Sequence, residues 1–150
     1  VNMVYAADQL QKQDLEISES ALKELDVLVA AINEILDLSL ETFVNNDIEK
    51  AKLVEPLEQV IDKLKEKMRA KHILRLQQGE CSIKSGFIWA DLLTDLERVA
   101  DHCSNIAICV IDAADNKMNM HESIKELRTD NAEFEKNYNL YKAKYKLPTN

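Results

Sequence analysis

The feature that most constrains this chain is its shortage of residues that break helices. Only two glycines and two prolines occur in 150 residues, of which 46% are apolar and 31% are charged. Because helices commonly stop at glycine and proline, long helices joined by short turns are expected. A chain of this length is also long enough for one domain with its own hydrophobic core. The composition therefore favours an all-α fold.

Apolar residues recur at helical spacing in four segments, which predicts four long helices. The first covers about residues 20–44, the second begins after Asp47 and reaches Gln78, the third covers about 82–115 and the fourth about 121–145. Asp47 is a suitable N-cap, and Gly79 is suited to end a helix in a left-handed conformation. Such helices are expected to pack as an antiparallel bundle. The expected inward stripe of the first helix is Leu22, Leu25, Leu28, Val29, Ile32, Leu36 and Phe43.

The charge balance and the cysteines argue against several classes of protein. With 27 acidic and 19 basic side chains the net charge is -8, which disfavours nucleic acid and anionic membranes as partners and favours cations. Cys81, Cys103 and Cys109 lack the spacing of a disulfide framework or a zinc site, so a reduced, cytosolic setting fits best. Cys103 lies on an apolar arc and is expected to be a core thiol. No apolar run approaches the roughly 20 residues that span a bilayer.

Two pairs of acidic residues four positions apart share one frame, Leu-Glu-x-Val-x-Asp. The frame occurs in LEQVID, which carries Glu58 and Asp62, and in LERVAD, which carries Glu97 and Asp101. The two pairs are equally distant from the expected turn at Gly79. An antiparallel hairpin would therefore set Glu58 level with Asp101, and Asp62 level with Glu97. Both pairs lie beside the apolar arcs of their helices, where they could line an outer groove.

Four carboxylates at one level repel one another unless a cation neutralises them or protons are taken up. Carboxylate oxygens suit magnesium, manganese or iron, and zinc is also suitable, so one interpretation is a site for multivalent metal ions. The other interpretation is a solvated acidic face, because like charges at this spacing cost only about 0.2 to 0.5 kcal/mol. The pair Asp91 and Asp95, on the solvent side of the third helix, illustrates such a face.

Other side chains near LERVAD are weaker candidates. His102 follows Asp101 but points away from the groove on a helical wheel, and Asn105 lies one turn beyond Asp101. Either residue would support a metal site rather than define it. A ferritin-like di-iron centre is disfavoured, since no Glu is followed three positions later by His. No catalytic constellation can be recognised.

The segment LERVADHCSNIA, residues 96–107, resembles the E/DxxxD signature and the following Asn-Ile-Ala of the PhoU family of phosphate-transport regulators, and LEQVID resembles the partner motif. The similarity covers roughly residues 20–115 and is greatest to the PhoU-like cytoplasmic domain of bacterial sodium-dependent phosphate cotransporters. It implies a PhoU-like three-helix core at 20–116, preceded by a lead-in or short helix at 1–19 and followed by a packed C-terminal helix at 117–150. It also implies metal ions at Glu58, Asp62, Glu97 and Asp101.

By this resemblance the chain is a non-enzymatic regulatory domain at the cytoplasmic face of the cell membrane. Its expected partner is a membrane transporter portion of the same chain, with hydrophobic helices upstream, and phosphate could bridge bound metal ions. Regulators of this family usually have two three-helix repeats, so a homodimer could supply a second bundle, or one repeat could suffice. Two alternatives stay open: a metal-free helical protein-interaction module, and a metal-dependent hydrolase for which no base or nucleophile is visible.

Overall fold

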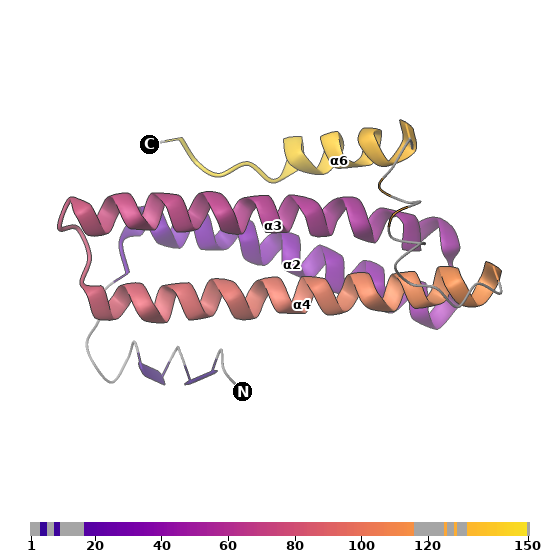
Figure 1. Ribbon diagram of the computed structural model, residues 1–150, viewed down its shortest axis with the longest axis horizontal. Helices are drawn as coiled ribbons and strands as arrows, with labels where there is room; N and C mark the ends of the chain where they lie inside the picture. The colour runs from indigo at the N-terminus through magenta and orange to yellow at the C-terminus, as the bar shows by residue number, and fades with distance from the viewer. Residues whose placement is uncertain are drawn as a thin grey trace.

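The computed structural model describes residues 4–5, 8–9, 17–115, 125, 128 and 132–149. Within these residues the main elements are the helices α2 (Glu19–Asn45), α3 (Ile48–Gln77), α4 (Ile83–Asp115) and α6 (Ala132–Lys144). Helices α2, α3 and α4 pack against one another in antiparallel order, and α6 lies along the outer side of α3 (Figure 1). The predicted all-α antiparallel bundle is confirmed. None of the described helices has the length and apolar character needed to cross a membrane.

Short-range hydrogen bonds set the ends of the helices. The Ser18 hydroxyl accepts from the Ala21 backbone N–H, and the Asp47 carboxylate accepts from the Lys50 backbone N–H at 3.1 Å, so both residues are N-caps. After α3, Gly79 has a φ of 72°, the left-handed conformation that favours glycine. The roles predicted for Asp47 and Gly79 are therefore confirmed, and the turn at Gly79 makes α3 and α4 an antiparallel hairpin.

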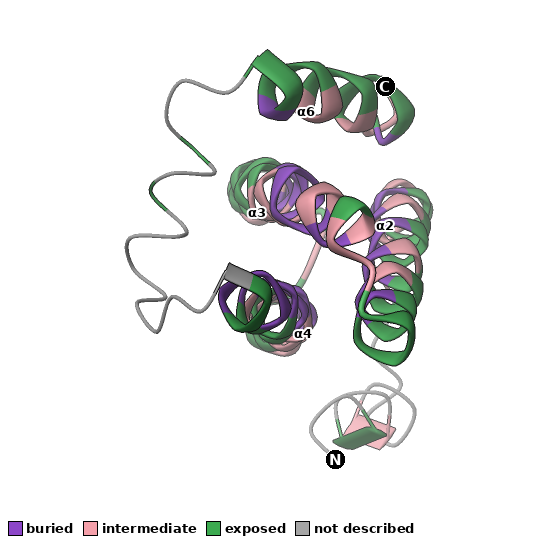
Figure 2. Cartoon of the chain, turned by 90° about the vertical axis from the view of Figure 1, so that its right-hand side faces the viewer, coloured by how far each residue is buried: buried purple, intermediate pink, exposed green. Residues whose placement is uncertain are grey.

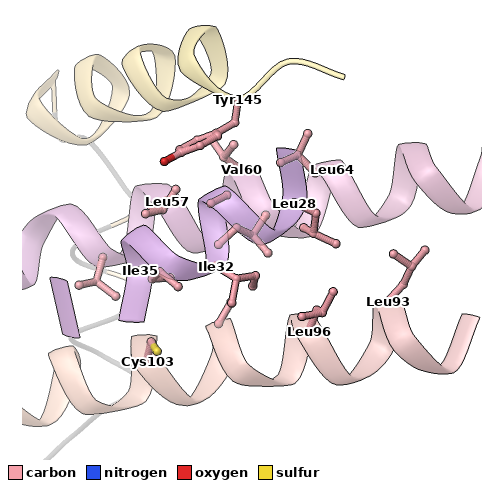
Figure 3. Close-up of a cluster of buried hydrophobic side chains, with 14 of the residues drawn as sticks. Leu28, Ile32, Ile35, Leu57, Val60, Leu64, Leu93, Leu96, Cys103 and Tyr145 are labelled. Carbon is pink, nitrogen blue, oxygen red and sulfur yellow. The ribbon is translucent and has the colours of Figure 1, made fainter. Parts of the chain in front are cut away.

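The hydrophobic core lies between α2, α3 and α4. Leu28, Leu57 and Leu93, one from each helix, are fully buried, and Figure 3 shows their side chains gathered with those of neighbouring turns. Viewed along the bundle, buried residues gather on the facing sides of the helices (Figure 2). Cys103 belongs to this core, as predicted, and burial raises the pKa of its thiol.

The prediction for the inward stripe of α2 was partly wrong. Leu22, Val29, Leu36 and Phe43 recur every seven residues but are exposed, by 38% to 70%. The parallel row that begins at Ala21, one residue earlier, is buried instead: Ala21, Leu28, Ile35 and Thr42. This row faces α3 and α4. Two rows one residue apart have the same periodicity, so periodicity alone did not decide which row faces the core.

The C-terminal helix α6 packs against α3. Phe134 is buried, and Tyr138 and Tyr141 pack against the core residues. Lys144 is paired with Glu34 of α2 at 2.7 Å, and the Tyr145 hydroxyl donates to the same carboxylate. The start predicted for this helix near residue 121 and most of the proposed lead-in at 1–19 lie outside the described residues.

Candidate functional site

The two acidic pairs lie on neighbouring antiparallel helices. The Lys65 ammonium is 3.2 Å from an Asp62 oxygen and 3.2 Å from a Glu97 oxygen. Because Asp62 belongs to α3 and Glu97 to α4, this shared partner places the two carboxylates at the same level of the hairpin, as predicted. Glu58 and Asp101 lie about one turn away along their own helices. We call these four residues the acidic groove.

Glu58 occupies the more buried part of the acidic groove, with 13% of its side chain exposed. Loss of hydration on burial raises its pKa to about 7, and the negative charge of Glu55 acts in the same direction. Asp62 and Asp101 raise the pKa further, whereas the charge of Arg128 opposes them. Glu58 is therefore a carboxylate whose negative charge is incompletely compensated, and its neighbours include acids from both helices.

Arg128 interacts more closely with Glu55 than with Glu58. Its Nε donates to Glu55 at 2.6 Å, while its Nη2 lies 3.5 Å from Glu58. Glu55 is almost completely buried and also accepts a hydrogen bond from the Ser104 hydroxyl of α4. Arg128 and Ser104 therefore compensate the negative charge of Glu55. The guanidinium of Arg128 lies farther from Glu58 and neutralises its charge only in part.

The remaining candidate residues lie nearer the solvent. Asp101 is exposed and forms no ion pair with any described residue, and the adjacent His102 is also exposed. Asn105 is half-buried, and among the described residues no hydrogen bond joins it or His102 to the acidic groove. Supporting roles for His102 and Asn105 stay predictions.

Sequence reasoning missed three residues that shape the electrostatics of this site. Lys65 lies three positions after Asp62 on the same helix, so the spacing contained a signal for that ion pair. Glu55 lies one turn before Glu58, but nothing in its local sequence indicated burial. Arg128 reaches Glu55 from 73 residues away in the sequence, a contact that depends on the fold.

The donor set suits a hard cation, but the side chains do not converge on one point. All four groove residues are carboxylates, and Glu58 and Asp101 are poorly compensated or unpaired, which fits a multivalent metal ion in charge and ligand type. Within the part of the chain that the structure describes, no three His, Cys, Asp or Glu side chains are placed to hold one ion. Lys65 supplies the positive charge between Asp62 and Glu97 instead.

Comparison with known proteins identifies a family for most of this bundle. The family model described as PhoU domain matches residues 25–110, which include the whole acidic groove but not α6. The phosphate-specific transport system accessory protein PhoU homolog 1 of Thermotoga maritima is 28% identical over 110 residues, covering 73% of this chain and 47% of that relative. The chain thus spans about half the length of the curated relative it matches. No solved structure gives a significant match.

Proposed function

The chain belongs to the PhoU family, and from this premise we propose that it is a regulatory domain of phosphate transport that binds multivalent metal ions at the acidic groove. The observation that carries the metal site is the meeting of Asp62 of α3 and Glu97 of α4, both 3.2 Å from the Lys65 ammonium, beside the partly buried Glu58, whose pKa is raised by burial and by neighbouring acids. A bound cation would relieve the repulsion among these carboxylates, in competition with protons and with the Lys65 ammonium.

The ligands of the proposed site would be Glu58, Asp62, Glu97 and Asp101. Oxygen donors of this type suit iron, manganese or magnesium, and zinc is also suitable. A metal ion would give this acidic surface a means of holding phosphate, because a cation reverses the local sign of charge. The proposed role is regulatory rather than enzymatic, in keeping with a relative that is named as an accessory protein.

The proposed place of action is the cytoplasmic face of the cell membrane, next to a phosphate transporter. The motifs of this chain resemble those of domains appended to sodium-dependent phosphate cotransporters, which makes a transporter portion of the same chain the first candidate partner. Because the chain spans about half the length of its relative, a second copy of the bundle is the second candidate. Either partner would need an exposed contact surface, and the apolar row of α2 at Leu22, Val29, Leu36 and Phe43 supplies one.

One observation favours the alternative of a metal-free interaction module. Lys65 already bridges Asp62 and Glu97, and Arg128 approaches Glu58, so part of the negative charge is neutralised without metal. In that case the acidic groove would only keep the surface hydrated. The two functions differ in whether a metal ion stabilises the fold.

Thermal unfolding of metal-stripped protein separates these two functions. Added manganese, iron, zinc or magnesium should raise the melting temperature with concentration, since a ligand at 100 times its Kd stabilises the folded state by about 2.7 kcal/mol. The variant Glu97→Gln with Asp101→Asn should lose this response. The matched control, Asp91→Asn with Asp95→Asn on the same helix, removes the same charge outside the groove and should keep it.

Equal responses of the two variants, or no response of the unmodified protein to any of the four metals, would support the metal-free module. The regulatory role is tested separately by phosphate uptake in cells. The full-length protein carrying the Glu97→Gln and Asp101→Asn changes should alter how uptake responds to external phosphate. An uptake response identical to that of the unmodified protein would contradict a regulatory role of the groove.

A further inference from the structure

A second charged site lies on the other side of α3, where α6 and the residues after it cover the bundle. A cleft of about 830 Å³ opens there between α3 and the C-terminal segment, within the roughly 300 to 1,000 Å³ typical of small-molecule sites. At 3.6 residues per turn, the α3 positions that line it, such as Val60 and Lys67, face away from Glu58 and Asp62. Figure 2 shows α6 and α4 on opposite sides of α3.

The cleft concentrates positive charge in a chain whose net charge is -8. Five lysines line it: Lys63, Lys67 and Lys71 from α3, and Lys142 and Lys146 from the C-terminal segment. None of the described residues that line it is Asp or Glu. Like charges that face one another across a cleft are unfavourable in the absence of an anion, so this arrangement favours a negatively charged ligand.

Ion pairs inside the protein neutralise part of this charge, since the Lys63 ammonium lies 2.8 Å from a Glu66 oxygen. Lys67 and Lys146 form no ion pair with a described residue, and Lys142 lies over the Tyr138 ring at 5.9 Å from its centroid. Lys71 is 3.1 Å from Glu24, but the Arg75 guanidinium binds the same carboxylate through both of its oxygens. Two cations thus share the single negative charge of Glu24.

The other wall of the cleft is apolar and aromatic. Val60 and Leu64 of α3 line the cleft together with Tyr138, Tyr145 and Leu147, and Figure 3 shows the Tyr145 ring beside Val60. Tyr145 belongs to the buried core and the Lys144 ammonium lies 5.3 Å from the centroid of its ring, so Tyr138 is the more accessible of the two rings. A ligand that fills the cleft would therefore meet lysines on one part and a flat apolar surface on another.

The C-terminal residues that close the cleft are held in place by specific contacts. The Lys71 ammonium donates to the backbone carbonyl of Pro148 at 3.1 Å, and Tyr145 and Lys144 both bind Glu34 of α2. The cleft is therefore preformed, which reduces the entropy lost on binding. These residues also lie outside the segment matched by the PhoU domain, so the family match does not account for the cleft.

We propose that this basic cleft binds a phosphorylated ligand of nucleotide size. Lysine is a common partner of phosphate, and the lysines on both sides of the cleft would bind the phosphate groups. The half-buried ring of Tyr138 would contact the flat, apolar part of the ligand, because aromatic side chains stack on such surfaces. The site is independent of the acidic groove and of any metal bound there.

Calorimetric titration of the whole chain with ADP in the presence of a metal chelator tests the proposal without involving the acidic groove. ADP should bind saturably, at one molecule per chain. It should bind about tenfold more tightly than pyrophosphate, which lacks the nucleoside, and than adenosine, which lacks the phosphate groups. Lys67→Gln with Lys146→Gln should weaken ADP binding about tenfold, because it removes two charged contacts. The control Lys84→Gln with Lys136→Gln removes two exposed lysines outside the cleft and should change binding less than about twofold.

Three results would overturn the proposal. One is the absence of saturable ADP binding up to millimolar concentration. Another is equal weakening by the cleft variant and the control variant, which would indicate a general effect of charge. The third is pyrophosphate binding as tightly as ADP, which would contradict a role for the aromatic wall. None of these results bears on metal binding, which the melting experiment measures separately.

Discussion

Replacement of Glu58 by Gln should stabilise the metal-free protein at alkaline pH. In the folded chain the pKa of this carboxyl is raised from 4.5 to about 7, chiefly by burial and by the charge of Glu55. That difference corresponds to about 3 kcal/mol between the two protonation states. The net effect is smaller, because 13% of the Glu58 side chain is still exposed and because a neutral Gln interacts less strongly with Arg128. We therefore expect the free energy of unfolding of the variant to be higher by about 2 kcal/mol.

The sign of the effect depends on pH. Between pH 4.5 and about 7 the folded state holds the Glu58 proton that the unfolded state has released, so the free energy of unfolding falls as the pH rises. Above about pH 7 both states are ionised at this position and the destabilisation is complete. Glu58→Gln should therefore match the unmodified protein near pH 4.5 and exceed its stability at pH 8.

Urea denaturation followed by circular dichroism, with a chelator present, measures this difference. The free energy of unfolding is obtained by linear extrapolation at pH 4.5 and at pH 8 for each protein. Asp91→Asn, which removes a carboxylate from the exposed side of α4, is the control and should keep the pH dependence of the unmodified protein. Identical pH dependence for Glu58→Gln and the unmodified protein would refute the claim that Glu58 is under electrostatic strain.

Three further substitutions test the packing. Glu24→Gln should lower the free energy of unfolding by about 3 kcal/mol or more, because it leaves Arg75 with an unpaired buried charge; a loss below 1 kcal/mol would contradict this reading of the ion pair. Gly86→Ala would place its Cβ 2.7 Å from Nε2 of the buried His72, and thermal unfolding should show a loss of about 1 to 3 kcal/mol. Gly79→Ala meets no atom within 4 Å but keeps a φ of 72°, so its cost should be about 1 kcal/mol, and a cost larger than that of Gly86→Ala would reverse the expected order.

The ends of the helices could be predicted from the sequence because their signals are local. Asp47 caps α3 through the backbone three residues later, and Gly79 takes up a conformation that other residues avoid. Which apolar row of α2 is buried could not be predicted in the same way. That choice depends on which side of α2 faces α3 and α4, and both rows contain large apolar residues, such as Leu28 in the buried row and Leu22 in the exposed row.

The placement of the acidic groove followed from symmetry about the turn, whereas its electrostatics did not. Asp62 and Glu97 had to meet once Gly79 fixed the hairpin, and they share Lys65. The compensation of Glu55 by Arg128 joins residues far apart in sequence and decides how much positive charge is left for Glu58. Sequence spacing specifies which carboxylates are neighbours, but burial and the distant cation Arg128 determine the pKa of Glu58.

The position of α3 between α4 and α6 explains how one small acidic protein can carry both an acidic groove and a basic cleft. If the lysines of the cleft lay on the same face as Glu58 and Asp62, the two clusters would form ion pairs and little charge would be left for ligands. A helix with its side chains is about 10 to 12 Å across, and charges at that separation in solution are largely screened at physiological ionic strength, where the Debye length is about 8 Å. Although Lys65 pairs with Asp62 and Glu97, and Lys63 pairs with Glu66, the remaining acids on the side facing α4 stay apart from the remaining lysines on the side facing α6. An ion of either sign can then be attracted to its own face of the same helix.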